Sequence, residues 1–178
     1  MAGSYHCLVE NINGTADVYL SHNGYGGFNS VRNFTTKTNS AAATVSRQGI
    51  ADLNKVIARG YTIENIDIVV PDNTPDMYNA LIYIQTDYSD IKIDGVRVTF
   101  VNHTVDPVGT NPSHLIRFNG NNKGDVIINN VEANTIGTAI RLDKRSSYDN
   151  KNSVVRIDNV RAEKAGTLVN SRGIQNLE

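Results

Sequence analysis

The stretch Asn-Asn-Val-Glu-Ala at 129–133 returns as Asp-Asn-Val-Arg-Ala at 158–162, and this recurrence decides the fold. Related segments lie upstream, Glu-Asn-Ile-Asp-Ile at 64–68 and Asp-Gly-Val-Arg-Val at 94–98. Their central apolar residues stand at positions 66, 96, 131 and 160, so the successive steps are 30, 35 and 29 residues. Steps of unequal length are typical of a solenoid whose coils differ in the length of their loops.

A second set of apolar segments takes the same relative place in each repeat, at 81–84, 115–118, 139–142 and 168–171. Apolar and polar residues alternate in both sets, which is the pattern of a strand with one face in a core. Strands this short are stable only when they stack on the strands of neighbouring repeats. The sequence therefore predicts an all-β fold, a right-handed parallel β-helix of about four coils.

Stacking would place equivalent residues of successive coils in columns. Positions 65, 95, 130 and 159 read Asn, Gly, Asn and Asn, residue types that tolerate a left-handed backbone at a sharp corner. Positions 67, 97, 132 and 161 read Asp, Arg, Glu and Arg, so the charge alternates from one rung to the next. We expect a corner column of asparagines and a ladder of exposed ion pairs, each worth about 0.2 to 1 kcal/mol.

Residues 46–60 interrupt this pattern. Ser46 suits a helix N-cap and Gly60 a C-terminal cap. The apolar residues between them lie at helical spacing: Ile50, Leu53, Val56 and Ile57. An open end of a β-helix exposes its strand edges and its core, so we expect one amphipathic α-helix that caps this end.

Three features follow one another near this helix: a Val-Arg-Asn-Phe strand at 31–34, the helix itself, and a strand that ends in Val70-Pro71. This order resembles the start of the β-helix in pectate-lyase-like proteins, a superfamily that includes phage tail spikes and neck appendages. The loop at 35–44 departs from the family pattern, because it lacks the aspartates and glycines of the T-D-D loop. The resemblance covers roughly residues 29–176 and implies a fold more than an activity.

We divide the chain into three parts on this basis. Residues 1–28 are expected to be the remnant of an expression tag followed by a linker or the edge of a preceding domain. Residues 29–60 are expected to form the N-terminal strand and the capping helix. Residues 61–178 are expected to form the coils of the β-helix, truncated at the C-terminus.

Composition excludes several classes of function. The 17 Lys and Arg residues balance 18 Asp and Glu residues, so the chain lacks the basic surface of a nucleic-acid-binding protein. No apolar run approaches the roughly 18 residues of a membrane span, and we expect no membrane insertion. We also expect no cofactor and no metal, because Cys7 stands alone and the four histidines lack ligand spacing. The loops at 119–125 and 143–153 could surround calcium, but neither has the aspartate order of a known calcium loop.

The outward positions of the second strand set form the most suggestive surface. Rung by rung they read Tyr with Gln, Arg with Asn, Arg with Asp, and Asn with Arg: Tyr83, Gln85, Arg117, Asn119, Arg141, Asp143, Asn170 and Arg172. An aromatic ring can cover the C–H face of a sugar, while guanidinium and amide groups bind its hydroxyls or carboxylates. These residues are therefore candidate glycan ligands, although the same pattern also fits an ordinary solvated face.

Two functions remain open. The resemblance implies a phage tail spike or appendage module, on a virion tail or extracellular, that forms a homotrimer and presents this face to bacterial polysaccharide. The alternative is a polysaccharide depolymerase, either a glycoside hydrolase or a lyase. Asp143 would then be the catalytic candidate, and hydrolysis would need a second carboxylate from Asp87, Asp90 or Asp149. The motifs R-x-P-x-x-R and W-x-D-H of the lyases are missing, which favours binding over cleavage.

Overall fold

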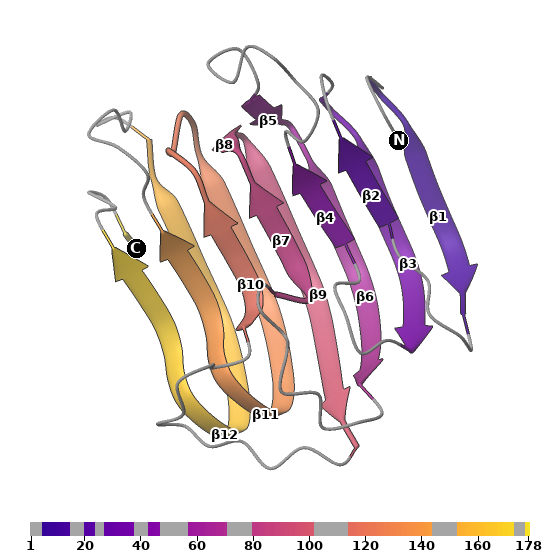
Figure 1. Ribbon diagram of the computed structural model, residues 1–178, viewed down its shortest axis with the longest axis vertical. Helices are drawn as coiled ribbons and strands as arrows, with labels where there is room; N and C mark the ends of the chain where they lie inside the picture. The colour runs from indigo at the N-terminus through magenta and orange to yellow at the C-terminus, as the bar shows by residue number, and fades with distance from the viewer. Residues whose placement is uncertain are drawn as a thin grey trace.

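The computed structural model of this protein describes residues 5–14, 20–23, 27–37, 43–46, 57–70, 80–101, 114–143, 153–172 and 177–178. Within these ranges every regular element is a β-strand (Figure 1). The strands are β1 (Leu8–Asn13), β2 (Leu20–Asn23), β3 (Ser30–Lys37), β4 (Ala43–Ser46), β5 (Ile57–Arg59), β6 (Thr62–Val70), β7 (Ile82–Gln85), β8 (Asp87–Ser89), β9 (Ile91–Phe100), β10 (His114–Asn119), β11 (Val126–Asp143) and β12 (Val155–Arg172).

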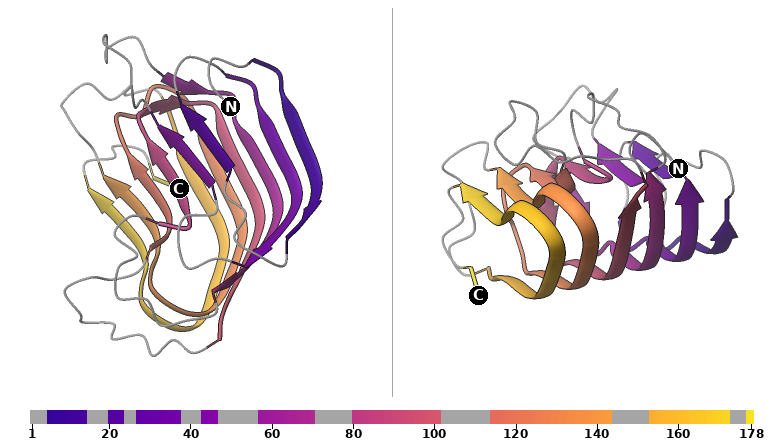
Figure 2. Two further views of the ribbon diagram at one scale, coloured as in Figure 1. Left: turned by 45° about the vertical axis from the view of Figure 1, so that its right-hand side comes forward. Right: turned by 90° about the horizontal axis from the view of Figure 1, so that it is seen from below.

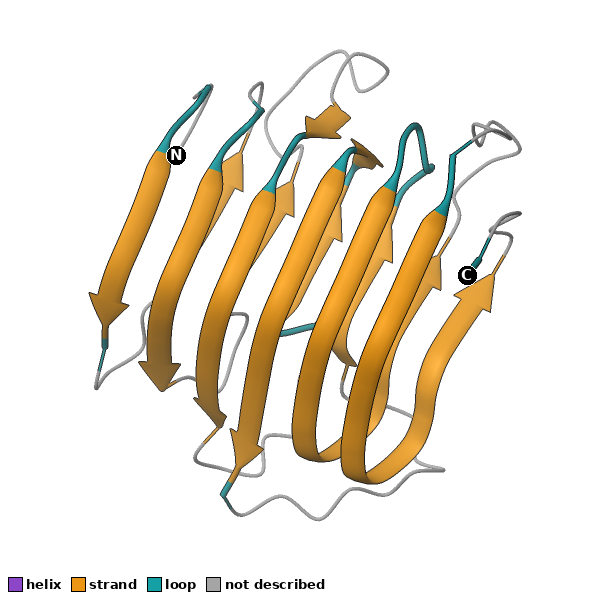
Figure 3. Ribbon diagram, turned by 180° about the vertical axis from the view of Figure 1, so that it is seen from behind, coloured by secondary structure: helices purple, strands orange, loops and turns teal. Residues whose placement is uncertain are grey.

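Most of these strands belong to one parallel sheet. Its order is β1-β3-β6-β9-β11-β10-β7-β4-β2, and β12 pairs with β11. The first half of β11 pairs with β9 and its second half pairs with β10, so the sheet bends along this strand. As a result the sheet curls back on itself, as the turned views show (Figure 2). From behind, the long strands lie side by side along the stack (Figure 3), and β5 and β8 form a separate parallel pair.

The all-β class and the parallel pairing agree with the sequence prediction, but the expected closed coils do not appear. The described residues form a curled sheet and not a closed β-helix. The reason is that the predicted period fixes which strands stack on each other, whereas closure depends on how each coil turns between its strands. Much of that turning falls in the ranges that the structure does not describe.

The predicted capping helix does not extend over 46–60 as expected, because both ends of this range are strands. Ser46 ends β4, which pairs with β7, and Ile57 begins β5, which pairs with β8. Residues 47–56 lie outside the described residues, and no helix occurs among the described ones. Local helical spacing is a weak signal, and strand pairing with residues far along the chain outweighs it at both ends of this segment.

The register confirms the alignment of the repeated segments. Ile66 pairs with Val96, Val96 with Val131, and Val131 with Val160. The corner column beside them has a left-handed backbone at every rung. Two earlier asparagines extend this column toward the N-terminus. The φ angles are 57° at Asn11, 50° at Asn33, 55° at Asn65, 70° at Gly95, 54° at Asn130 and 52° at Asn159.

Stacked apolar columns fill the inside of the curl. Phe34, Ile66, Val96 and Val131 form one column, and each is 1% exposed. A second column comes from β7, β10 and β11: Ile82, Ile116 and Ile140, each fully buried. Both columns belong to one hydrophobic core. Full burial of a side chain of this size contributes about 1.5–3 kcal/mol, so the curl is held mainly by these columns.

The strands at the two ends of the stack are less buried than those inside it. On β12, Ile157 and Val160 are partly buried, whereas their partners Ile128 and Val131 on β11 are almost fully buried. At the other end, Ile12 of β1 is partly buried, whereas its partner Phe34 on β3 is 1% exposed. The core columns therefore continue to both edges of the sheet, where solvent reaches them.

Candidate functional site

The eight predicted site residues lie on the strands that return along the second half of the curled sheet. Arg117 lies opposite Tyr83 on one side and Arg141 on the other, and Arg141 lies opposite Asn170. In the neighbouring row, Asp143 lies opposite Asn119 and Arg172, and Gln85 lies opposite Ser46. The alternation of the sequence and the repeat spacing thus placed these residues in two adjacent rows.

Three of these residues form one charged cluster. Arg117 Nε donates to Asp143 Oδ2 at 3.0 Å, and Arg141 Nε donates to the same oxygen at 2.7 Å. The side chains are only 17%, 21% and 14% exposed for Arg117, Arg141 and Asp143, respectively. Partial burial strengthens these charge-assisted hydrogen bonds, so the carboxylate holds both guanidinium groups in place.

Tyr83 is not an exposed aromatic platform. Its residue is 3% exposed, and the Cζ atom of Arg117 lies 5.5 Å from the centre of its ring. Asn119 Nδ2 donates to the Tyr83 hydroxyl at 3.1 Å. The ring therefore supports the Arg117 guanidinium by a cation–π contact and does not offer its face to a sugar.

His114, at the start of β10, joins the cluster next to Arg141, and the sequence pattern did not single it out. Its Nε2 atom lies 3.1 Å from Arg141 Nη1, and the residue is 4% exposed. A guanidinium can only donate, so Nε2 is the acceptor in this contact. The sequence carries one signal for it, because His114 directly precedes the apolar segment 115–118 of the second strand set.

The cluster opens toward solvent at β12. Asn170 is partly buried and Arg172 is exposed. Across the two rows, Arg117, Arg141 and Arg172 contribute three positive charges and Asp143 contributes one negative charge, a net charge of +2 from these four residues. We call this group, together with Asn170, the arginine face.

The carboxylates proposed as helpers of Asp143 are engaged elsewhere. Asp87 Oδ1 accepts from the backbone N–H of Asn121 at 2.9 Å, and Asp90 Oδ2 accepts from the Ser89 hydroxyl at 2.6 Å. Both carboxylates are therefore engaged within the protein, and Asp149 lies outside the described residues. Among the described residues, no group of three or more His, Cys, Asp or Glu side chains is arranged to hold a metal ion, and no helix is long and apolar enough to cross a membrane.

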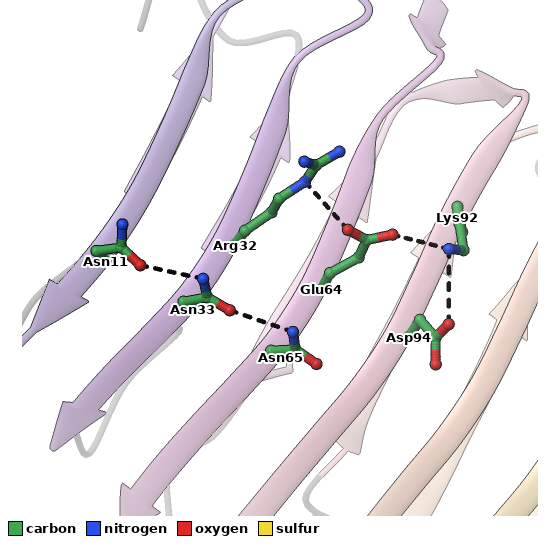
Figure 4. Close-up of polar contacts among 7 residues, drawn as sticks. All are labelled: Asn11, Arg32, Asn33, Glu64, Asn65, Lys92 and Asp94. Atoms are coloured by element: carbon green, nitrogen blue, oxygen red, sulfur yellow. Dashed lines mark hydrogen bonds and ion pairs between the residues drawn. The ribbon is translucent and has the colours of Figure 1, made fainter.

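A second feature lies on the outer surface of the other half of the sheet. A groove of about 250 Å³ follows the corner column across β6, β9, β11 and β12. The asparagines of this column donate to one another along the stack, and Figure 4 shows the first two bonds. Asn33 Nδ2 donates to Asn11 Oδ1 at 3.0 Å, and Asn65 Nδ2 donates to Asn33 Oδ1 at 3.1 Å. Asn159 Nδ2 donates to Asn130 Oδ1 at 2.6 Å, so the later rung is the donor in each pair.

Gly95 interrupts this amide ladder. Asn65 Oδ1 lies 2.9 Å from the place where a Cβ on residue 95 would stand, and it accepts no hydrogen bond from a described residue. On the other side, Asn130 Nδ2 donates to Asp94 Oδ1 at 2.8 Å. The ladder therefore has a notch one side chain wide, between Asn65 and Asn130.

Ion pairs flank the ladder on both sides. Glu64 lies between two cations, with Arg32 Nε at 3.0 Å and Lys92 Nζ at 2.7 Å (Figure 4). The pKa of Lys92 is raised, mainly by its hydrogen bond to Glu64. Arg97 bridges Asp67 at 3.5 Å and Glu132 at 3.6 Å, which confirms the predicted alternation over these three rungs. All three of these side chains are more than half exposed, so each pair contributes at most about 1 kcal/mol.

Comparison with family models, with curated proteins and with solved structures gave no significant match.

Proposed function

We propose that this protein is a right-handed parallel β-helix of the phage tail spike or appendage type, whose arginine face binds an acidic bacterial polysaccharide. The chain returns to the same register after each repeat, which supports a β-helix. A third set of contacts supports it too, because β5 and β8 pair with each other while Gly27 bridges to Arg59 and Tyr88 bridges to Asn122. These contacts lie where a third wall of each coil would stand.

The charge imbalance of the arginine face is the observation that carries the binding proposal. Charge pairing between strands typically gives each guanidinium a carboxylate of its own, whereas Arg117 and Arg141 both donate to Asp143. Arg172 lies opposite that carboxylate on β12 and is exposed. Guanidinium groups bind carboxylates in a planar, bidentate way, and strands about 4.8 Å apart repeat them along the stack. An extended chain of acidic sugars matches this spacing and charge.

Binding is a better proposal for Asp143 than catalysis. Hydrolysis of a glycosidic bond requires two carboxylates, roughly 5 to 9.5 Å apart, and Asp143 is the one acid in the two described rows. A general acid must also reach the glycosidic oxygen, whereas Asp143 Oδ2 already accepts hydrogen bonds from Arg117 and Arg141. Its role in the proposal is to orient Arg117 and Arg141 toward the ligand.

The proposal places the protein outside the cell or on a virion, where three copies bind one polysaccharide through several faces. Multivalent contact raises the overall affinity without any new residue contact. Measuring the mass of the protein in solution tests the trimer directly, and a monomeric mass at micromolar concentration would refute it.

Binding is tested with an acidic capsular polysaccharide and with the same polymer after chemical reduction of its carboxyl groups. We expect Arg172→Ala and Arg141→Ala each to weaken binding of the acidic polymer about 10- to 100-fold, which corresponds to roughly 1.5–3 kcal/mol for a hydrogen bond to a charged group. The matched control is Arg32→Ala, an exposed arginine on the other half of the sheet. Equal binding of the native and the reduced polymer would refute the proposal. Release of reducing ends or of unsaturated uronate during the assay would establish the depolymerase alternative instead.

A further inference from the structure

The notch at Gly95 is a second place where the outer surface is built to receive a polar group. The column supplies an asparagine at 65, 130 and 159 but a glycine at 95, so one carboxamide is missing from an otherwise continuous series. The groove that follows this column includes Asn65, Gly95 and Asn130 in its lining. Its volume of about 250 Å³ is below the roughly 300–1,000 Å³ of pockets for whole small molecules, so it suits a substituent of a larger ligand.

The orientation of the amide beyond the notch is fixed by Asp94. A carboxylate can only accept a hydrogen bond, so Asn130 must turn its NH₂ group toward Asp94, and the bond is 2.8 Å long. The NH₂ group has two N–H donors, and the second one is not used by a described residue. On the near side, Asn65 Oδ1 is an acceptor that no described donor reaches. The notch therefore offers one acceptor and one donor, on opposite sides of the missing side chain.

A trans secondary amide carries the complementary groups. Its N–H and its C=O point in opposite directions because the peptide unit is planar and trans, so the N–H can donate to Asn65 while the C=O accepts from Asn130. Val96 and Val131 also line the groove, and each is 1% exposed. Because both side chains belong to the buried core column, the complementarity of the notch to an amide rests on its polar groups.

We propose that the notch between Asn65 and Asn130 binds the acetamido group of an N-acetylated amino sugar. The N–H donates to Asn65 Oδ1 and the C=O accepts from Asn130 Nδ2. The sugar ring then lies over the exposed ion pairs of Arg97, whose charged groups hydrogen-bond its hydroxyls. The choice of a sugar as the carrier of the amide rests on the proposed function, whereas the complementarity of the notch to an amide does not.

The ligand series isolates the acetamido group. The trimer of N-acetylglucosamine carries acetamido groups, the trimer of glucose lacks them, and N-acetylglycine N-methylamide presents the same amides without a sugar. Binding is followed by titration with NMR detection of the side-chain NH₂ signals of Asn65 and Asn130. We expect the N-acetylglucosamine trimer to bind at least about tenfold more tightly than the glucose trimer and to shift both signals. Equal affinity of the two trimers overturns the proposal, and equal affinity of the N-acetylglycine compound overturns the assignment to a sugar.

Two variants test the site itself. Gly95→Asn fills the notch with the missing carboxamide, and the left-handed φ of 70° at this position suits asparagine. Asn65→Gly removes the acceptor and keeps the left-handed backbone. We expect both to lower the affinity for the N-acetylglucosamine trimer at least tenfold, and undiminished affinity of either variant refutes the site.

The same variants separate this inference from the proposed function. Gly95→Asn is also titrated with the acidic polysaccharide, which is read at the arginine face and not at the notch. Retained binding of that polymer, together with lost binding of the N-acetylglucosamine trimer, supports the notch in a folded protein. If the acidic polymer binds normally and the acetylated trimer does not bind to the unmodified protein, the inference fails while the proposed function stands.

Discussion

Gly120 gives the sharpest test of how tightly the coils are packed. A Cβ at this position would stand 1.9 Å from the carbonyl oxygen of Thr86 and 2.8 Å from the backbone nitrogen of Asp87. Gly124 lies in the same turn region, but a Cβ there would meet side-chain atoms and not the backbone. Its Cβ would stand 2.3 Å from Ser89 Oγ, which is the end of a side chain that can rotate. Neither glycine has a left-handed φ, so Gly→Ala at both positions tests packing alone.

The expected magnitudes follow from which atoms must move. An ordinary contact of a Cβ begins near 3.4 Å, so in Gly120→Ala the junction of β7 and β8 must shift by about 1.5 Å, the difference between 3.4 and 1.9 Å. Overpacking against backbone costs typically 1–3 kcal/mol and occasionally more, and the shift also strains the hydrogen bond from Gly120 N–H to Asp143 O. We expect Gly120→Ala to lower the free energy of unfolding by about 3 kcal/mol or more. Gly124→Ala should lower it by about 1 kcal/mol, chiefly through the hydrogen bond that Ser89 loses when it rotates.

Urea unfolding followed by circular dichroism measures both values, because the chain has no tryptophan to report by fluorescence. The two variants are compared at equal protein concentration, and the slope of the unfolding free energy with urea is checked to be the same. A difference of less than about 1 kcal/mol between Gly120→Ala and Gly124→Ala would contradict the close approach of β10 to the β7–β8 junction, since packing against backbone is then no more costly than against a mobile side chain.

Three further perturbations probe other parts of the molecule. Burial raises the pKa of Tyr61 to about 12, so this tyrosine ionises at a lower pH in the unfolded chain than in the folded one. The free energy of unfolding should therefore fall as the pH rises from 10 to 12, by up to about 1.4 kcal/mol per pH unit. Tyr61→Phe should remove this part of the decline, and identical pH profiles of the two proteins would contradict the prediction. Asn33→Gly should lower the free energy of unfolding by about 1 kcal/mol, because two exposed hydrogen bonds between asparagine side chains are lost. Asn33→Ala should lower it by about 1–2 kcal/mol more, because the backbone at this position is left-handed. Equal urea midpoints of the two variants would contradict the second expectation. Asp143→Asn should lower the free energy of unfolding by about 2 kcal/mol, because two partly buried guanidinium groups lose the carboxylate between them. An unchanged melting curve would show that the fold does not depend on this carboxylate.

The register of the stack could be predicted because it is written in local patterns. Alternation assigns each residue to the inside or the outside, and the recurrence of a five-residue segment aligns one coil with the next. Together these two patterns predict Arg117 beside Arg141 and Asn119 beside Asp143, and the pairing of β10 with β11 confirms both. The corner at Asn65 followed from the preference of asparagine and glycine for a left-handed backbone, but its first two rungs, at Asn11 and Asn33, lie outside the range in which the repeat was recognised.

Other features depend on contacts that no local pattern encodes. Alternation assigns Tyr83 to the outer face, yet its ring is buried because Arg117 lies over it and Asn119 holds its hydroxyl. The same limit applies at Ser46, where helical spacing predicted the start of a helix but the residue pairs with Gln85 of β7. In both cases the outcome is set by residues more than thirty positions away in the chain.

The two halves of the sheet differ in how their charged side chains are paired, and this difference is the basis of the proposed binding site. On the half that carries the corner column, Glu64 is held between Arg32 and Lys92, so each charge meets its opposite on a neighbouring strand. Pairing of this kind helps strands to stack and needs no ligand. On the arginine face, Arg117 and Arg141 meet on one carboxylate while both are about four-fifths buried. Positive charge in a partly buried place disfavours folding through desolvation and repulsion, and the proposed binding of an acidic polysaccharide would offset this cost.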